Sequence, residues 1–266
     1  MPKKKEKVEI QKITIKEEKR PTLLIATPMY GGMCTGQYMA GILATIEKMR
    51  SVGVKVYFAQ VMNESLITRA RNELARVFME SECDYLMFID ADIAFDGNAV
   101  AQLMAADRDI CCGIYPKKEI DWNQVEQAAK AGKSDLAKYA GAFVLNFPKS
   151  DNKYFETDED GVVEVRHGGT GFMLIKRRVF EKLKKYVPTY RASTVKKDGE
   201  YLKPECHEYF ATSIDDTGCL LSEDYHFCDI WRKSGGKVYA HPFIKLKHLG
   251  SYLFDGDILS AGSNLK

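Results

Sequence analysis

Short apolar runs alternate with stretches of helical spacing through the first third of the chain. Residues 22–26, 54–59 and 86–89 are short and apolar, which predicts strands. Between them, apolar residues recur at helical spacing over 39–49 and over 66–78, which predicts two amphipathic helices. The order strand, helix, strand, helix, strand is typical of a parallel, doubly wound sheet, because parallel neighbours need a crossover connection.

The rest of the chain continues this pattern with interruptions. Residues 110–114 and 172–175 predict further strands, and residues 122–139 predict a polar helical insertion. Residues 189–208 are rich in lysine and lack periodicity, which predicts a mobile flap. We therefore expect an α/β, Rossmann-like fold in which helices flank a mostly parallel central sheet.

Length and charge limit the possible classes of protein. We expect a single domain over residues 21–266, preceded by a solvated, charged tail at residues 1–20. A formal net charge of +2 argues against an extensive surface for binding polyanions. No apolar segment approaches the length of a transmembrane helix and no signal peptide is evident, so we expect a cytoplasmic protein with at most peripheral membrane association.

The cysteines indicate reduced thiols. They number seven, and no two show Cys-x-x-Cys spacing, which fits a reducing compartment. A zinc site made of Cys206, His207, Cys219 and Cys228 is not favoured, because these residues lack standard zinc-finger spacing.

Two acids directly after the third apolar run are the strongest sign of chemistry. Asp90 and Asp92 flank Ala91, and alternation along an extended chain would point both carboxylates to one side. Two convergent carboxylates suit a hard divalent cation, Mg²⁺ or Mn²⁺. Thr27 and Pro28 follow the first strand, so they are expected at the same edge of the sheet, where doubly wound folds bind ligands.

Five blocks of sequence together carry a resemblance to a known family. They are residues 27–30, residues 68–72, residues 90–92, residues 221–228 with Gly235 and Gly236, and residues 248–251. In this order they resemble the glycosyltransferases of the GT-A fold, of the family-2-like or viral and phage type. The resemblance extends over residues 22–257.

The resemblance implies a metal-dependent enzyme that uses a nucleotide sugar. In that family the Asp-x-Asp motif holds Mn²⁺ or Mg²⁺ against the donor diphosphate, which implies that Asp92, with Asp90, is a metal ligand. His248 matches the late histidine of the family and would be a third ligand. The metal would neutralise the charge of the leaving diphosphate. Donor contacts are expected from Thr27, Pro28, Tyr30, Ala91, Thr170 and Gly171, with Tyr30 stacking on the base.

Basic residues are candidates for the phosphate groups. Arg69 and Asn72 are three residues apart, hence on one helix face, where they could meet the diphosphate or the uridine. We expect the Arg71 side chain to point elsewhere. Lys118 is a further candidate for phosphate or acceptor. The alternative for all of them is a solvated surface.

A helix start at residues 222–224 carries the candidate base. Acids in a first helical turn are favoured on structural grounds alone. The resemblance places Asp224 at the general base of inverting transferases and gives Glu223 a role in binding the acceptor hydroxyl. We expect the helix terminus to lower the pKa of Asp224.

The expected function is transfer of a sugar from a nucleoside diphosphate sugar, a UDP-sugar by resemblance, to a hydroxyl of a glycan or other acceptor. Inversion is expected, and retention stays open. A sugar-phosphate nucleotidyltransferase is an alternative, but residues 31–34 lack the basic side chain such enzymes carry after their first strand. A non-catalytic protein that binds sugar nucleotides is the third possibility.

Overall fold

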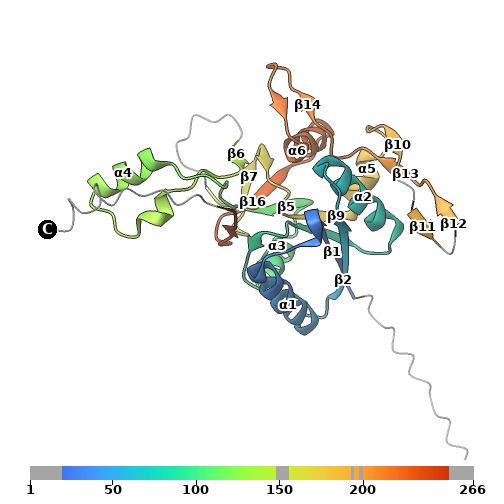
Figure 1. Ribbon diagram of the computed structural model, residues 1–266, viewed down its shortest axis with the longest axis horizontal. Helices are drawn as coiled ribbons and strands as arrows, with labels where there is room; N and C mark the ends of the chain where they lie inside the picture. The colour runs from blue at the N-terminus through green and yellow to red at the C-terminus, as the bar shows by residue number, and fades with distance from the viewer. Residues whose placement is uncertain (1–19, 148–155, 193–194, 198–199, 252–266) are drawn as a thin grey trace, which may run out of the picture.

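The computed structural model describes residues 20–147, 156–192, 195–197 and 200–251. The charged tail expected at residues 1–20 lies outside this part of the chain, apart from Arg20. The described residues form an α/β fold around one seven-stranded sheet (Figure 1). The fold class predicted from the sequence is therefore confirmed.

Five strands of the central sheet run in one direction and two run against them. The strands lie in the order β2 (Lys55–Met62), β1 (Thr22–Met29), β3 (Tyr85–Ile89), β9 (Phe172–Lys176), β5 (Ile110–Gly113), β16 (Val238–His241) and β7 (Val163–Val165). Strand β9 is antiparallel to both of its neighbours, and β7 is antiparallel to β16. The loop that precedes β9 therefore reaches the edge at which β3 and β5 end.

Helices cover both faces of this sheet. One face carries α1 (Gly36–Ser51) and α3 (Ala99–Ala105), and the other carries α2 (Ile67–Glu80), α5 (Arg177–Leu183) and α6 (Glu223–Lys233). Alternation in β3 supplies both layers, because Leu86 and Phe88 face one core while Met87 and Ile89 face the other. A strand that is buried on both faces reads as an unbroken apolar run in the sequence.

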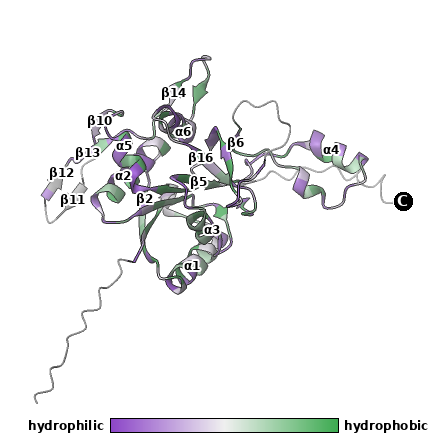
Figure 2. Ribbon diagram, turned by 180° about the vertical axis from the view of Figure 1, so that it is seen from behind, coloured by the Kyte–Doolittle hydropathy of each residue, from purple (hydrophilic) through white to green (hydrophobic). Residues whose placement is uncertain are grey.

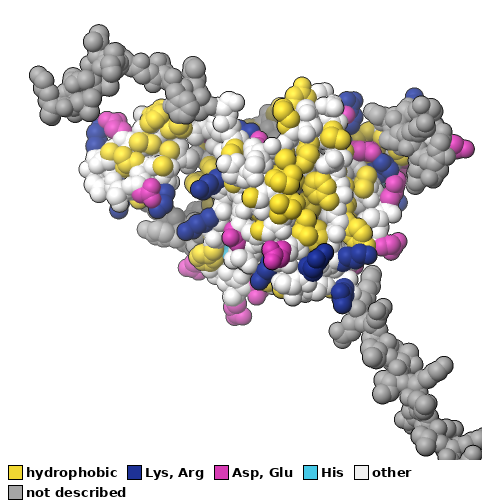
Figure 3. All heavy atoms as spheres, turned by 60° about the horizontal axis from the view of Figure 1, so that its bottom comes forward, with side chains coloured by type: hydrophobic (Ala, Val, Ile, Leu, Met, Phe, Trp, Pro, Cys, Tyr) yellow, Lys and Arg dark blue, Asp and Glu magenta, His cyan; other side chains and the backbone are white. Residues whose placement is uncertain are grey.

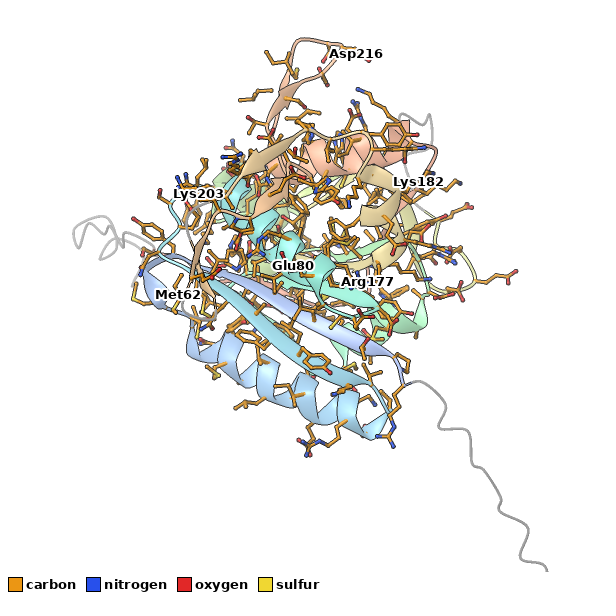
Figure 4. All side chains as sticks on the ribbon, turned by 90° about the vertical axis from the view of Figure 1, so that its right-hand side faces the viewer. Met62, Glu80, Arg177, Lys182, Lys203 and Asp216 are labelled. Atoms are coloured by element: carbon orange, nitrogen blue, oxygen red, sulfur yellow. The ribbon has the colours of Figure 1, made fainter. Side chains whose placement is uncertain are left out.

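Arg177 fastens α5 to the C-terminal end of α2. Its guanidinium donates to the carbonyls of Phe78 at 2.9 Å, Ser81 at 2.8 Å and Cys83 at 2.7 Å. Figure 4 shows Arg177 near Glu80, the last residue of that helix. The last carbonyls of a helix lack partners within the helix, so this side chain satisfies groups that would otherwise be unpaired.

The flap predicted over residues 189–208 is instead built largely of strands. Strand β10 (Thr189–Arg191) pairs with β13 (Glu205–His207), and β11 (Val195–Lys197) pairs with β12 (Glu200–Leu202). The prediction of an irregular loop is wrong here, because short two-stranded pairs bury too little to show a hydrophobic period. A second hairpin, β14 (Ser213–Ile214) with β15 (Leu220–Leu221), carries Asp216 in its turn (Figure 4).

The helical insertion predicted at residues 122–139 is confirmed. It contains α4 (Trp122–Lys130) and the 3₁₀ turn η2 (Leu136–Tyr139). Figures 1 and 2 show it as an arm that projects away from the sheet. The remaining short elements are η1 (Tyr30–Gly32), β4 (Ile93–Ala94) paired with β17 (Lys247–His248), and β6 (Leu145–Asn146) paired with β8 (His167–Gly168).

Strand β2 is an edge strand of the sheet and exposes apolar side chains to solvent. Tyr57, Phe58 and Met62 on this strand are exposed, as are Met39 and Leu43 on the neighbouring helix α1. Figure 3 shows hydrophobic side chains gathered on one face of the molecule. Within the described residues, no helix combines the length and apolar character needed to span a membrane. All seven cysteines are described, and none forms a disulfide.

Candidate active site

The chain turns sharply after β3 and brings Asp90, Ala91 and Asp92 to one cavity. The Asp90 amide donates to the Gly171 carbonyl at 2.9 Å, and the Ile93 amide donates to the Asp90 carbonyl at 3.1 Å. The cavity has a volume of about 450 Å³. Its lining comprises Pro28, Tyr30, Met33, Cys34, Thr35, Glu64, Ser65, Ile67, Asp90, Ala91 and Asp92. The carboxyl ends of β1 and β3 therefore meet here, as the sheet topology predicts.

Asp92 is held between two basic side chains. Lys118 Nζ forms an ion pair with Asp92 Oδ2, and His248 Nε2 lies 3.4 Å from Asp92 Oδ1. Burial alone would raise the pKa of Asp92, but hydrogen bonds with His248 and Lys118 lower it to about 2. The carboxylate is therefore ionised at neutral pH.

His248 is positioned by the pairing of β17 with β4. His248 stands opposite Ile93 in that pair, and the Leu249 amide donates to the Asp92 carbonyl at 2.9 Å. His248 Nδ1 lies 2.9 Å from the Pro116 carbonyl, which can only accept, so this nitrogen carries a proton. Nε2 is then the ring nitrogen that faces Asp92; with a proton it donates to the carboxylate, and without one it offers a lone pair to a cation.

The donor set around Asp92 fits a divalent cation in part. A carboxylate oxygen and an imidazole lone pair converge there, and Mg²⁺ typically takes one or two carboxylates and completes its shell with water and phosphate oxygens. Among the described residues, no group of three or more His, Cys, Asp or Glu side chains is placed to hold a metal ion. Asp92 and His248 are thus the side chains that could hold the ion, with other ligands supplied by substrate or water.

Asp90 faces a buried arginine rather than His248. Arg71 Nη2 lies 3.0 Å from Asp90 Oδ1 and donates to Asp90 Oδ2 at 3.1 Å, while Arg71 Nε donates to Glu223 Oε1 at 3.3 Å. The Arg71 side chain is only 3% exposed, and its guanidinium lies 5.3 Å over the ring of Phe88. The prediction that Arg71 points away from the site is wrong.

The acids at the start of α6 belong to this partly buried cluster. Asp224 Oδ1 accepts from the Ser222 hydroxyl and from the Tyr225 amide. Burial, reinforced by the negative charge of Glu223, raises the pKa of Asp224. The expected lowering by the helix terminus is therefore wrong, because loss of hydration outweighs the amide, the hydroxyl and Arg71. A raised pKa makes Asp224 a stronger base.

A glycine-rich loop closes the cluster from the strand β9 side. The Gly171 amide donates to Tyr115 Oη at 3.0 Å. A Cβ at Gly169 would lie 2.2 Å from Tyr115 Oη, and a Cβ at Gly171 would lie 3.0 Å from Asp90 Oδ2. Thr170 is buried between them, and its hydroxyl has no hydrogen-bond partner among the described residues. The glycines thus allow backbone to pass close to Tyr115 and Asp90.

Arg69 and Asn72 are not brought to the Asp90 cavity. Arg69 forms a bidentate ion pair with Glu64, at 2.6 Å and 2.7 Å, and lines a second cavity of about 280 Å³. The Asn72 amide is buried and bonds both backbone groups of Phe210, at 2.8 Å and 3.1 Å. Their expected contact with the donor therefore has no support from this geometry.

The remaining candidates lie at or near the cavity. Pro28 and Tyr30 line it, and the Tyr30 ring is 73% exposed. Thr27 is fully buried, and its hydroxyl forms a hydrogen bond with Tyr38 Oη at 2.5 Å, so it lies behind the residues that line the cavity and does not line it itself. Thr35 caps α1 through the Tyr38 amide and its own amide donates to the Ala91 carbonyl at 2.9 Å.

Arg71, Tyr115 and Glu64 were missed by the sequence reasoning. Arg71 had a readable signal, because Leu74, Ala75 and Phe78 follow it at helical spacing and are all buried. An arginine on the apolar stripe of a helix needs a buried partner. Tyr115 and Glu64 had no such signal, because both lie in connections.

Comparison with known proteins gives distant structural similarity only. No family model matches the chain, and no curated protein matches its sequence. The structure is similar to that of GalNAc-T7 with UDP, GalNAc and Mn²⁺, with 13% identity, a TM-score of 0.42, and coverage of 88% of this chain and 45% of that one. It is also similar to S. aureus TarS in complex with UDP-GlcNAc, with 12% identity, a TM-score of 0.40, and coverage of 90% and 61%. The chain thus spans less than two thirds of each.

Proposed function

We propose that this protein is a metal-dependent glycosyltransferase that moves a sugar from a nucleoside diphosphate sugar, a UDP-sugar, to an acceptor hydroxyl with inversion. The observation that carries the proposal is the convergence of the Asp92 carboxylate and His248 Nε2 beside a cavity that Asp90 also lines. The sequence blocks that resemble GT-A glycosyltransferases supply the residues of this corner.

The chemistry follows from the charges of these side chains. A divalent ion held by Asp92 and His248 would neutralise the negative charge that develops on a departing diphosphate. Asp90 is compensated by Arg71, so its charge competes less with the phosphates than an unpaired carboxylate would. Tyr30 offers an exposed ring at the cavity for a nucleobase.

Asp224 is proposed as the general base. Its raised pKa favours acceptance of the proton from the acceptor hydroxyl as that oxygen attacks the anomeric carbon. Arg71 bonds Glu223 and Asp90 at once, so it holds the acids of α6 in a fixed relation to the carboxyl end of β3. Glu223 is proposed to bind the acceptor.

A nucleotidyltransferase is less well supported. Such enzymes generally carry a basic side chain in a glycine-rich loop directly after their first strand, whereas residues 31–34 of this chain include neither lysine nor arginine. Pyrophosphate release from a sugar phosphate and a nucleoside triphosphate would favour this alternative over ours.

A screen of nucleotide sugars tests the proposal without knowledge of the acceptor. With Mn²⁺ present, slow hydrolysis of one donor should release its nucleoside diphosphate, and Asp92→Asn should reduce the rate at least about a hundredfold, because the ion loses its carboxylate. The matched control is Asp216→Asn, an exposed acid in the β14–β15 hairpin, which should leave the rate unchanged (Figure 4). Equal activity of Asp92→Asn and the wild type would refute the metal site.

Product analysis decides the stereochemical part of the proposal. Once an acceptor is found, NMR of the first product should show the anomer opposite to that of the donor. A product with the donor's configuration would remove Asp224 from its role as base of a single displacement.

A further inference from the structure

Lys118 is paired with the carboxylate of Asp92, which is the proposed ligand of the metal ion. Its ammonium group forms an ion pair with Asp92 Oδ2, while His248 approaches Oδ1 of the same carboxylate. The side chains of Lys118 and Asp92 are 43% and 32% exposed. The pair is thus open to solvent and can part without burying a charge, unlike the pair of Asp90 with the buried Arg71.

The aliphatic part of the Lys118 side chain packs closely against the backbone of Gly250. A Cβ at Gly250 would lie 2.9 Å from Cδ of Lys118, 3.2 Å from Cγ and 3.5 Å from Cβ. The backbone of Gly250 therefore runs directly along the lysine stem, where any side chain would push it away. Gly250 has no left-handed backbone conformation to explain its presence, so space is the reason for a glycine here.

The same segment is tied to the histidine. The Pro116 carbonyl accepts from His248 Nδ1, and the Lys117 amide donates to the Ala142 carbonyl at 2.7 Å. The segments that carry Lys118 and His248 are therefore hydrogen-bonded to each other, and both side chains contact the Asp92 carboxylate. An ammonium group on one oxygen of this carboxylate and a divalent ion on the other repel each other at such short range, so each weakens the binding of the other.

We infer that Lys118 is a resident cation at Asp92 that a divalent ion displaces, and that the displaced ammonium then binds the diphosphate of the nucleotide. The inference rests on the proposed function and adds an exchange of partners to it. In the ion-free protein Lys118 keeps Asp92 paired. In the loaded protein the lysine is free beside the phosphates, where a flexible ammonium is a suitable partner for an anion.

The exchange predicts two effects of opposite sign for Lys118→Met, which removes the charge and keeps the stem. Binding of Mn²⁺ alone, measured by electron paramagnetic resonance of the free ion, should become about three- to tenfold tighter, because an exposed ion pair no longer competes. Binding of UDP in the presence of saturating Mn²⁺, measured by calorimetry, should become weaker by a similar factor. Neither measurement requires turnover.

Lys117→Met is the matched control. It removes the same charge from the neighbouring residue, which is paired with Glu119 at 3.8 Å rather than with Asp92. Mn²⁺ affinity should stay within about twofold of the wild type, since the ammonium group of Lys117 is exposed and does not compete for the Asp92 carboxylate. Gly250→Ala is a second test, because its Cβ would displace the lysine stem and should also tighten Mn²⁺ binding.

The outcomes separate this inference from the proposed function. If the wild type binds Mn²⁺ and Asp92→Asn does not, while Lys118→Met binds it no more tightly, the exchange is overturned and the metal site stands. If Lys117→Met matches Lys118→Met, a general charge effect replaces the exchange. If the wild type binds no Mn²⁺ at all, both the proposed function and the exchange are refuted.

Discussion

At the scale of single residues, the buried charge of Arg71 organises the site. Its guanidinium bonds Asp90 after β3 and Glu223 at the start of α6, two positions more than a hundred residues apart in the chain. A buried charge is tolerated only when it is paired, so the three side chains depend on one another. Arg71 Nη1 is buried and has no hydrogen-bond partner among the described residues, which leaves its two N–H groups for a bound water or substrate group.

Replacement of Arg71 by methionine should destabilise the protein strongly. Asp90 and Glu223 would lose their counter-charge in a partly buried place, so we expect a loss of about 3 kcal/mol in the free energy of unfolding, measured with urea. Arg69→Met is the control from the same helix. The Arg69 side chain is 47% exposed, so water screens its ion pair with Glu64 and the loss should be much smaller than for Arg71. Equal losses in the two variants would contradict the role given to Arg71.

At the scale of elements, the glycine loop before β9 and the tyrosine after β5 must fit together. Gly169→Ala places a methyl group 2.2 Å from Tyr115 Oη and 2.7 Å from its Cζ, so the ring or the loop has to move. Because Tyr115 is almost fully buried, we expect about 1–3 kcal/mol of destabilisation in chemical denaturation.

Gly36→Ala is the control for this substitution. Gly36 is the first residue of α1, its Cβ would meet nothing within 4 Å, and its backbone conformation is an ordinary one. The change should be neutral or slightly stabilising, since alanine favours helix over glycine. A Gly169→Ala protein as stable as Gly36→Ala would mean that the Tyr115 packing matters little.

The elements that the sequence predicts well are those whose burial produces either apolar residues at helical spacing or an unbroken run of apolar residues. Leu86 to Ile89 are apolar because both faces of β3 are covered, and the stripe of α2 follows from the core it meets. The direction of β9 could not be predicted, because a strand buried on both faces reads the same in either direction.

The part of the site that could be predicted consists of residues directly after the strands of the sheet and of residues that the resemblance selected. The resemblance selected Asp92 and His248, and the structure brings their side chains together. The residue of α2 that reaches Asp90 was not predicted: Arg69 and Asn72 were chosen from their spacing and the resemblance, whereas the structure pairs Arg71 with Asp90 and Asn72 with Phe210. The raised pKa of Asp224 could not be foreseen, because burial depends on loops distant in sequence.

At the scale of the whole molecule, the arm that carries α4 is independent of the sheet. Ala128 is the only buried residue of α4, and η2 has none. The Asp121 amide donates to the Ala140 carbonyl at 2.8 Å, so the two ends of the arm lie together. Figures 1 and 2 show the arm standing clear of the helices that cover the sheet.

Replacement of residues 122–139 by two glycines should therefore leave the sheet intact. The gap between Asp121 and Ala140 is short enough for such a link, and little buried apolar surface is lost. We expect the free energy of unfolding to change by less than about 1 kcal/mol, with an unaltered circular dichroism transition temperature for the core. A collapse of the transition would show that the arm is part of the cooperative unit.

Strand β7 runs against β16, so it begins at the rim of the sheet where β5 ends. The connection that leaves the sheet after Gly113 therefore re-enters it at Val163, at the same edge of the sheet. Lys118 lies within this connection and contacts Asp92 at the cavity, so insertions or deletions there would alter the surroundings of Asp92 and leave all seven strands of the sheet in place.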